Sequence, residues 1–138
     1  MAVAFQVDFI LYQVGTDDFL HSFFSTISHN LEPNGWGTKF PLLMKKLYVG
    51  KLEWSDVPEA IEEVKKVKSE LIKFDVDKVI WDIDDLSKQP PWGTNISSEI
   101  TSLANYFVTS DGRDLFDVLQ KAMQDSLLEH IDLEVVSI

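Results

Sequence analysis

The segment with the most obvious chemical potential is an apolar run that ends in three carboxylates. Val79-Ile80-Trp81 is followed by Asp82-Ile83-Asp84-Asp85. In phosphotransferases with an aspartate nucleophile, one carboxylate attacks phosphorus, a second carboxylate two residues on moves the proton, and magnesium screens the charge. Asp82 and Asp84 have this spacing. They therefore predict, as one alternative, a magnesium-dependent phosphatase.

The rest of the chain does not complete such a site. The motif begins at position 82 of 138, whereas the phosphatase fold needs it on the first strand with a long α/β body behind it. Leu86 stands where these enzymes usually carry threonine, and no later strand supplies a second pair of aspartates. Because aspartate is a common turn residue, we interpret Asp84 and Asp85 individually as turn residues.

Other candidate groups also fail to assemble a reactive site. His21, His29 and His130 have neither metal-ligand spacing nor a carboxylate at a matching offset. Segment 109–112 (TSDG) lacks the glycine pattern of a nucleophile elbow, and segment 35–37 (GWG) is not followed by the Lys-Ser/Thr of a phosphate loop. The chain has no cysteine, which excludes thiol chemistry and disulfides. We therefore predict no catalytic residue, no metal and no cofactor.

The charge balance favours a protein partner. Lys and Arg number 12 against 23 Asp and Glu, so the net charge is −11. So acidic a surface repels phosphate backbones, which excludes nucleic acid as a partner and suits a basic protein. Asp75 and Asp77 add to the negative potential of the Asp82 cluster. Trp54 and Trp92 lie in or beside predicted loops, as does Trp36, where an aromatic ring is either a packing lid or an interface anchor.

The elements that must position these residues follow from hydrophobic periodicity. Alternation from Val3 to Tyr12 predicts one half-buried strand that ends at Gly15. Thr16 is expected to cap a helix whose apolar stripe begins at Phe19. The remaining predicted elements are a short helix over 42–48, a strand over 51–54, a helix over 55–71 capped by Ser55, strands over 78–83 and 101–109, a helix over 115–127 with a capping box from Asp111 to Asp114, and a strand over 131–135.

This order predicts an α+β fold in which a mixed or antiparallel sheet packs with three to four helices, because it lacks the regular βαβ spacing of a doubly wound sheet. The length predicts a single domain over residues 1–138. No apolar stretch approaches the roughly 18 residues that span a bilayer, and no targeting segment is visible. We expect a cytoplasmic protein that does not enter a membrane.

Five segments carry a resemblance to a known family. They are Gly35-Trp36-Gly37 with Pro41-Leu42-Leu43-Met44, Leu47-Tyr48-x-Gly50-x-Leu52, Val79 to Asp85, Pro90-Pro91-Trp92-Gly93, and Asn105 to Gly112. In this order and spacing they resemble the immunity protein 70 family of bacterial polymorphic toxin systems. The match runs from Gly35 to the last predicted helix, and its tryptophan-rich blocks are moderately specific. The resemblance implies an intracellular protein that binds and neutralises a cognate toxin domain, and it assigns no residue a role.

Charge and resemblance together give a hypothesis for the binding site. Many such toxins are nucleases with basic substrate grooves, to which an acidic inhibitor would be steered. The candidate partner-binding residues are Asp75, Asp77, Asp82, Asp84, Asp85, Trp54 and Trp92. An intracellular adaptor that binds a host protein remains the alternative in the binding class. The identity of the toxin, active-site or exosite inhibition, and the oligomeric state are left open.

Overall fold

A computed structural model describes residues 1–138 as an α+β fold with a four-stranded antiparallel sheet and three main helices. This confirms the predicted fold class. The strands lie in the order β2-β1-β4-β3. Their bounds are β1 Ala2–Val7, β2 Ile10–Thr16, β3 Lys51–Leu52 and β4 Leu133–Ser137. The helices are α1 Asp17–Leu31, α2 Val57–Leu71 and α3 Leu115–Glu129, with a π-helix η1 at Leu43–Leu47 and 3₁₀ turns η2 at Trp54–Asp56 and η3 at Val76–Lys78.

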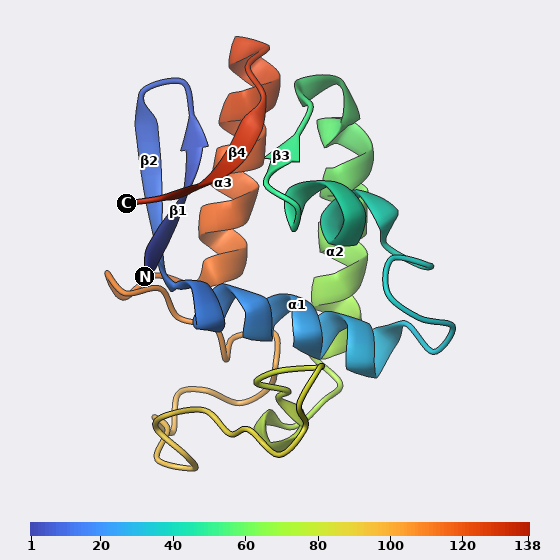
Figure 1. Ribbon diagram of the computed structural model, residues 1–138, viewed down its shortest axis with the longest axis vertical. Helices are drawn as coiled ribbons and strands as arrows, with labels where there is room; N and C mark the ends of the chain where they lie inside the picture. Colours follow the sequence, from blue (N-terminus) through green and yellow to red (C-terminus); the bar gives the residue numbers. More distant parts are fainter.

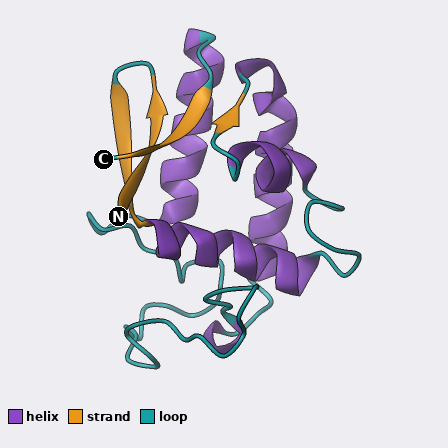
Figure 2. Cartoon of the chain, viewed as in Figure 1, coloured by secondary structure: helices purple, strands orange, loops and turns teal.

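The helices form two layers around the core. α2 and α3 run side by side and α3 packs against the sheet, whereas α1 crosses one end of this assembly (Figure 1). Segment 72–114 contains no strand and no helix apart from η3, and it lies on the far side of α1 (Figure 2). As a result α1 is enclosed between the sheet-and-helix layer and this long segment.

The N-terminal alternation forms a hairpin, so the prediction of one strand from Val3 to Tyr12 is wrong. β1 and β2 pair in antiparallel register, with Val7 opposite Ile10, and the chain reverses at Asp8 and Phe9. Asp8 takes the left-handed backbone conformation with φ 55°, which aspartate tolerates better than most residues. Because alternation continues along both arms and no glycine marks the reversal, the pattern alone reads as a single strand.

The predicted helices are confirmed because their periodicity matches their burial. On α1 the whole apolar stripe that begins at Phe19 is buried, and the Oγ1 atom of Thr16 accepts a hydrogen bond from the Phe19 amide at 3.1 Å. Phe23 lies at the centre, with its ring edge-on to Phe24, Phe107 and Phe116. The buried stripe of α2 is likewise the predicted one: Ala60, Val64, Val67 and Leu71.

Two predicted helix caps differ from the structure. Ser55 lies inside the 3₁₀ turn η2 and does not cap α2. The cap of α3 is Asp114 alone, whose carboxylate accepts from the Phe116 amide at 2.8 Å. Asp111 accepts from the Thr109 hydroxyl instead, so no capping box forms.

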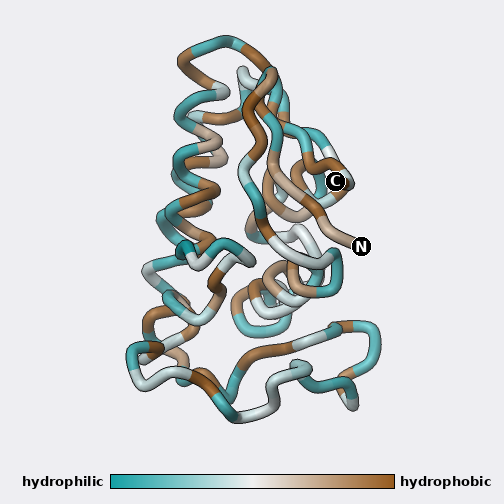
Figure 3. Tube along the Cα trace, turned by 90° about the vertical axis from the view of Figure 1, so that its left-hand side faces the viewer, coloured by the Kyte–Doolittle hydropathy of each residue, from teal (hydrophilic) through white to brown (hydrophobic).

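The strands predicted over 78–83 and 101–109 are wrong. Apart from η3, the only regular pairing in segment 72–114 is a single bridge from Val108 to Asp114. The lower loops in Figure 3 carry short hydrophobic stretches between hydrophilic ones, and these stretches imitate a strand pattern. None of the helices is both long and apolar enough to cross a bilayer.

Candidate functional site

The polar face of α1 holds the segment that leads to the aspartate cluster. Ser22 donates to the Ile80 carbonyl oxygen at 2.7 Å, and the Ile80 amide donates to the Thr26 hydroxyl at 3.0 Å. The Ile83 amide donates to Ser25 at 3.2 Å. Helix side chains thus satisfy backbone groups that a neighbouring strand would otherwise pair. This explains how the apolar residues Val79 and Ile80 lie against α1 without belonging to the strand that was predicted here.

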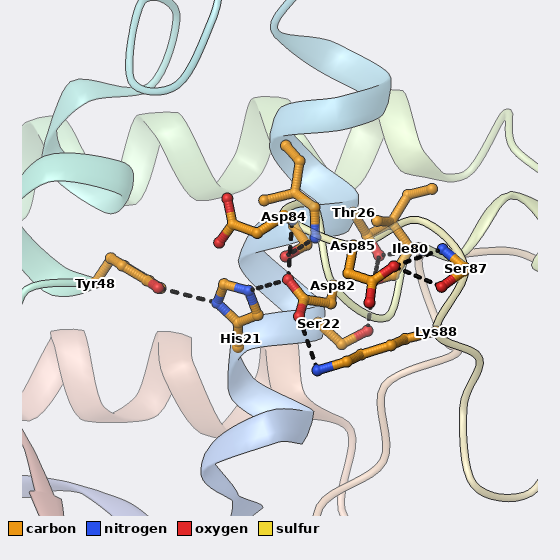
Figure 4. Close-up of polar contacts among 12 residues, drawn as sticks. His21, Ser22, Thr26, Tyr48, Ile80, Asp82, Asp84, Asp85, Ser87 and Lys88 are labelled. Carbon is orange, nitrogen blue, oxygen red and sulfur yellow. Dashed lines mark hydrogen bonds and ion pairs between the residues drawn. The ribbon is translucent and has the colours of Figure 1, made fainter.

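Asp82 is the centre of a polar network that joins α1, η1 and segment 72–114 (Figure 4). Its Oδ1 atom accepts from the Asp84 amide at 2.9 Å and lies 3.0 Å from Nε2 of His21. Its Oδ2 atom lies 3.5 Å from Nζ of Lys88. The backbone N–H of Asp84, followed by His21, holds the pKa of Asp82 below its usual value. Asp82 is therefore a carboxylate whose two oxygen atoms are both engaged.

The histidine in this network was missed by sequence reasoning. We expected no histidine with a carboxylate partner, but the fold brings His21 to Asp82 across 61 positions of sequence. The other ring nitrogen, Nδ1, lies 2.9 Å from the hydroxyl of Tyr48. No spacing rule could find this pair, because its members come from different elements.

The network positions loops, and both His21 and Asp82 are engaged within it. Ligand atoms of His21, Asp82 and Asp84 lie within 4.8 Å of one another, which is close enough to share a metal ion. A cation there would have to displace the His21 contact and face the Lys88 ammonium group, so the residues do not fit a metal centre. An aspartate nucleophile would need a free oxygen, and Asp82 has none. Burial, with the charges of Asp84 and Asp82, raises the pKa of Tyr48, so its hydroxyl stays protonated.

Asp84 and Asp85 extend the cluster to the surface, and both are exposed. Asp85 accepts hydrogen bonds from the amide and the hydroxyl of Ser87, which lower the pKa of the Asp85 carboxyl group. The amide of Asp85 donates back to the Asp82 carbonyl oxygen at 3.1 Å. Asp85 therefore acts as a turn residue, as its type predicts, while it also presents charge to solvent.

Trp92 packs against other aromatic residues and is also partly exposed. Its indole Nε1 atom donates to the Tyr106 hydroxyl at 2.8 Å, and its ring lies edge-on to Trp81 with centroids 5.4 Å apart. Even so, 39% of Trp92 remains exposed. Trp81 itself is only partly buried. A fixed and partly exposed indole has the geometry of an interface anchor.

The remaining candidates divide between two ends of the molecule. Asp75 and Asp77 are exposed at η3 in segment 72–114, with Asp82, Asp84, Asp85 and Trp92 farther along the same segment. Trp54 lies in η2, at the opposite end in Figure 1, with its ring stacked on His130 at 4.2 Å. The structure thus places the acidic candidates and Trp92 on one segment and separates Trp54 from them.

Two glutamates, one buried and one half-buried, hold the loop that supports the network, and sequence reasoning missed both. Glu32, 4% exposed, accepts from the amides of Gly37, Lys39 and Phe40, each at 3.0 Å. Glu63 accepts from the two amides at the start of η1, and burial raises its pKa. Neither residue belongs to a motif. The chain has 23 acidic residues, and no local signal separates these two from the other 21.

The loop held by Glu32 ends in an aromatic contact to the network. The indole of Trp36 donates to the Met44 carbonyl oxygen at 2.8 Å and lies edge-on to Tyr48 with centroids 4.8 Å apart. Tyr48 in turn contacts His21. The segments that carried the family resemblance, around Trp36, Tyr48 and Asp82, therefore meet in space.

The fold and the site define a small acidic α+β domain, in which the polar cluster makes internal hydrogen bonds and the exposed surface of segment 72–114 carries carboxylates and an indole. Comparison with family models gives the particular group: residues 5–135 match the model of immunity protein 70, and the chain belongs to that family. Searches of curated proteins and of solved structures returned no match. Immunity proteins neutralise a cognate toxin and are generally not catalytic. The match includes the N-terminal hairpin and α1, which contributed little to the resemblance in sequence.

Proposed function

We propose that this protein neutralises its toxin through the acidic surface of segment 72–114, which covers a basic groove of a nuclease toxin. The observation that carries the proposal is the exposed pair Asp84 and Asp85, held in place by the hydrogen bonds from α1 to Ile80 and Ile83. Trp92 lies on the same segment and supplies apolar contact area.

Charge supports this choice of surface. Residues 75–111 contain seven acidic residues and two lysines, a net charge of 2 − 7 = −5 out of the −11 of the whole chain. One of the two lysines, Lys88, pairs with Asp82. A concentrated negative potential raises the association rate with a basic partner and makes that rate fall as salt rises.

Anchoring the acidic residues also favours inhibition. A surface that is ordered before binding loses little conformational entropy on association. The network of His21, Asp82 and Tyr48 supplies that order without exposing a reactive group. Since the toxin acts on the producing cell itself, the proposal places the protein in the cytoplasm of that cell.

The test is co-expression with the toxin domain encoded beside this gene, scored by growth and then by co-purification at low and high salt. We expect the wild type to rescue growth and to form a complex that weakens with salt. The double variant D84K/D85K should lose protection. The matched control E62K/E129K makes the same change in net charge at exposed positions of α2 and α3, and it should keep protection.

Three outcomes would count against parts of the proposal. Full protection by D84K/D85K would remove this surface from consideration. A complex that is insensitive to salt would exclude electrostatic steering. Absence of both rescue and complex would refute inhibition of that toxin and favour an adaptor that binds a host protein.

A further inference from the structure

An apolar hollow opens beside Trp92, between the start of α1 and segment 72–114. Its volume is about 250 Å³. The floor is formed by buried Phe19 and Tyr106, and the rim by Trp92 and Val108, which are 39% and 42% exposed. Ile96 and Ile100 complete the apolar lining. This volume lies below the roughly 300–1,000 Å³ of small-molecule sites and suits one side chain of a protein partner.

The walls of the hollow are fixed by contacts that do not depend on a partner. The hydrogen bond from Trp92 to the Tyr106 hydroxyl closes one side. Phe19 and Tyr106 both pack against Phe107 of the core, with ring centroids 5.8 and 5.1 Å apart. A hollow formed before binding does not need to be ordered by its ligand.

Carboxylates lie near this apolar centre, although none lines it. A second hollow, of about 470 Å³, shares Ile96 and Tyr106 with the first and includes Asp77 in its lining. Asp17 and Asp18 directly precede Phe19, which lines the first hollow, and both are exposed. These nearby carboxylates make a second copy of this chain a poor occupant, since pairing two such surfaces would bring like charges together. Charge complementarity therefore selects a basic partner.

We propose that the hollow lined by Phe19, Trp92 and Val108 receives one apolar side chain from a basic surface of the toxin. This inference rests on the proposed function and names the anchor of the same interface. The two parts of the interface have separate kinetic effects. The exposed carboxylates of segment 72–114 act on the association rate, whereas a buried apolar anchor acts mainly on the dissociation rate.

The test measures the association and dissociation rates of the purified chain with the adjacent toxin domain, in a catalytically inactive form. Val108→Trp fills the hollow from its rim, and Val108→Arg places a cation at its mouth. Val49→Trp is the matched control, because Val49 is 77% exposed and lies in the turn after η1. Urea unfolding of each variant verifies that it remains folded.

We expect both Val108 variants to dissociate at least about tenfold faster than wild type, which is the effect of losing a hot-spot contact. For V108W the association rate should change less than about twofold, because no charge is altered. D84K/D85K should show the reverse pattern, with slower association. V49W should behave as wild type.

The outcomes separate the two proposals. If wild type binds and D84K/D85K weakens binding, but V108W and V108R dissociate at the wild-type rate, the anchor is refuted and the acidic interface stands. If wild type forms no complex, both proposals fall. If sedimentation shows a wild-type dimer that V108W dissociates, the occupant is a second copy and the proposed anchor is wrong.

Discussion

Replacing Glu32 should destabilise this protein far more than an ordinary surface substitution would. Its carboxylate accepts three backbone hydrogen bonds, and two of them, from Gly37 and Phe40, are buried. In Glu32→Ala, those two donors lose their acceptor, and each buried unsatisfied donor costs about 1–3 kcal/mol. We therefore expect a loss of about 4 kcal/mol, which is a large part of the roughly 5–15 kcal/mol that stabilises a typical domain.

Glu32→Gln should fall between alanine and wild type. Oε2 accepts from Lys39 and Phe40 and Oε1 accepts from Gly37. A glutamine whose oxygen faces the first pair turns its amide group toward the Gly37 N–H, so one donor is lost. The expected cost is about 2 kcal/mol. The control Glu53→Gln alters an exposed glutamate that makes no capping hydrogen bond, and it should cost less than about 0.5 kcal/mol.

The assay is urea unfolding, monitored by tryptophan fluorescence and by circular dichroism. With an m-value of about 2 kcal/mol per molar urea, the alanine variant should lower the midpoint by about 2 M. The same variant should also weaken toxin protection, because the Glu32 loop supports Tyr48 through Trp36. If E32A unfolds within about 1 kcal/mol of E53Q, the three hydrogen bonds do not stabilise the loop and the reasoning is refuted.

Two further predictions concern the contacts of α1 and α3. Thr26→Val removes both hydrogen bonds between Thr26 and Ile80, so the Ile80 amide should exchange at least about tenfold faster while the α2 amides stay protected. Unchanged exchange at Ile80 would show that Thr26 does not hold this segment against α1. The hydrogen bond from Tyr12 lowers the pKa of Asp125, so this carboxylate stabilises the fold above its unfolded pKa of about 3.9 and the contribution is lost as pH falls. Burial, aided by Asp125, raises the pKa of Tyr12, whose contribution is present below about pH 10 and is lost as pH rises further. Tyr12→Phe should therefore flatten the stability profile at both ends, and a profile parallel to wild type from pH 3 to 11 would show that this pair is not coupled.

Much of the fold could be predicted because helical periodicity is local. The stripe that begins at Phe19 and the stripe from Ala60 to Leu71 each report one buried face, and both faces are buried as expected. The cap at Thr16 needs only the three residues that follow it. These features depend on residues within a few helical turns of one another, where residues that are close in sequence are also close in space.

The candidate site could be predicted only in part. The aspartates and Trp92 were selected by residue type, and they do share one segment of the fold. Asp82 is paired with His21 and Lys88, whereas Asp84 and Asp85 stay exposed. This difference arises because α1 lies against that segment. The sequence shows which residues are acidic or aromatic, but it does not show which of these side chains remain exposed to a partner.

The sequence by itself determined the composition of the surface and the identity of the helices, because charge and periodicity are properties of the chain. Only the tertiary structure decided which partners satisfy each polar group. Residues 78–83 carry a strand pattern, yet the backbone groups of Ile80 and Ile83 bond to side chains of α1: Ser22, Ser25 and Thr26. A buried backbone group needs a partner but does not specify which one, so the choice between a strand and a helix side chain falls to whichever element the fold brings alongside.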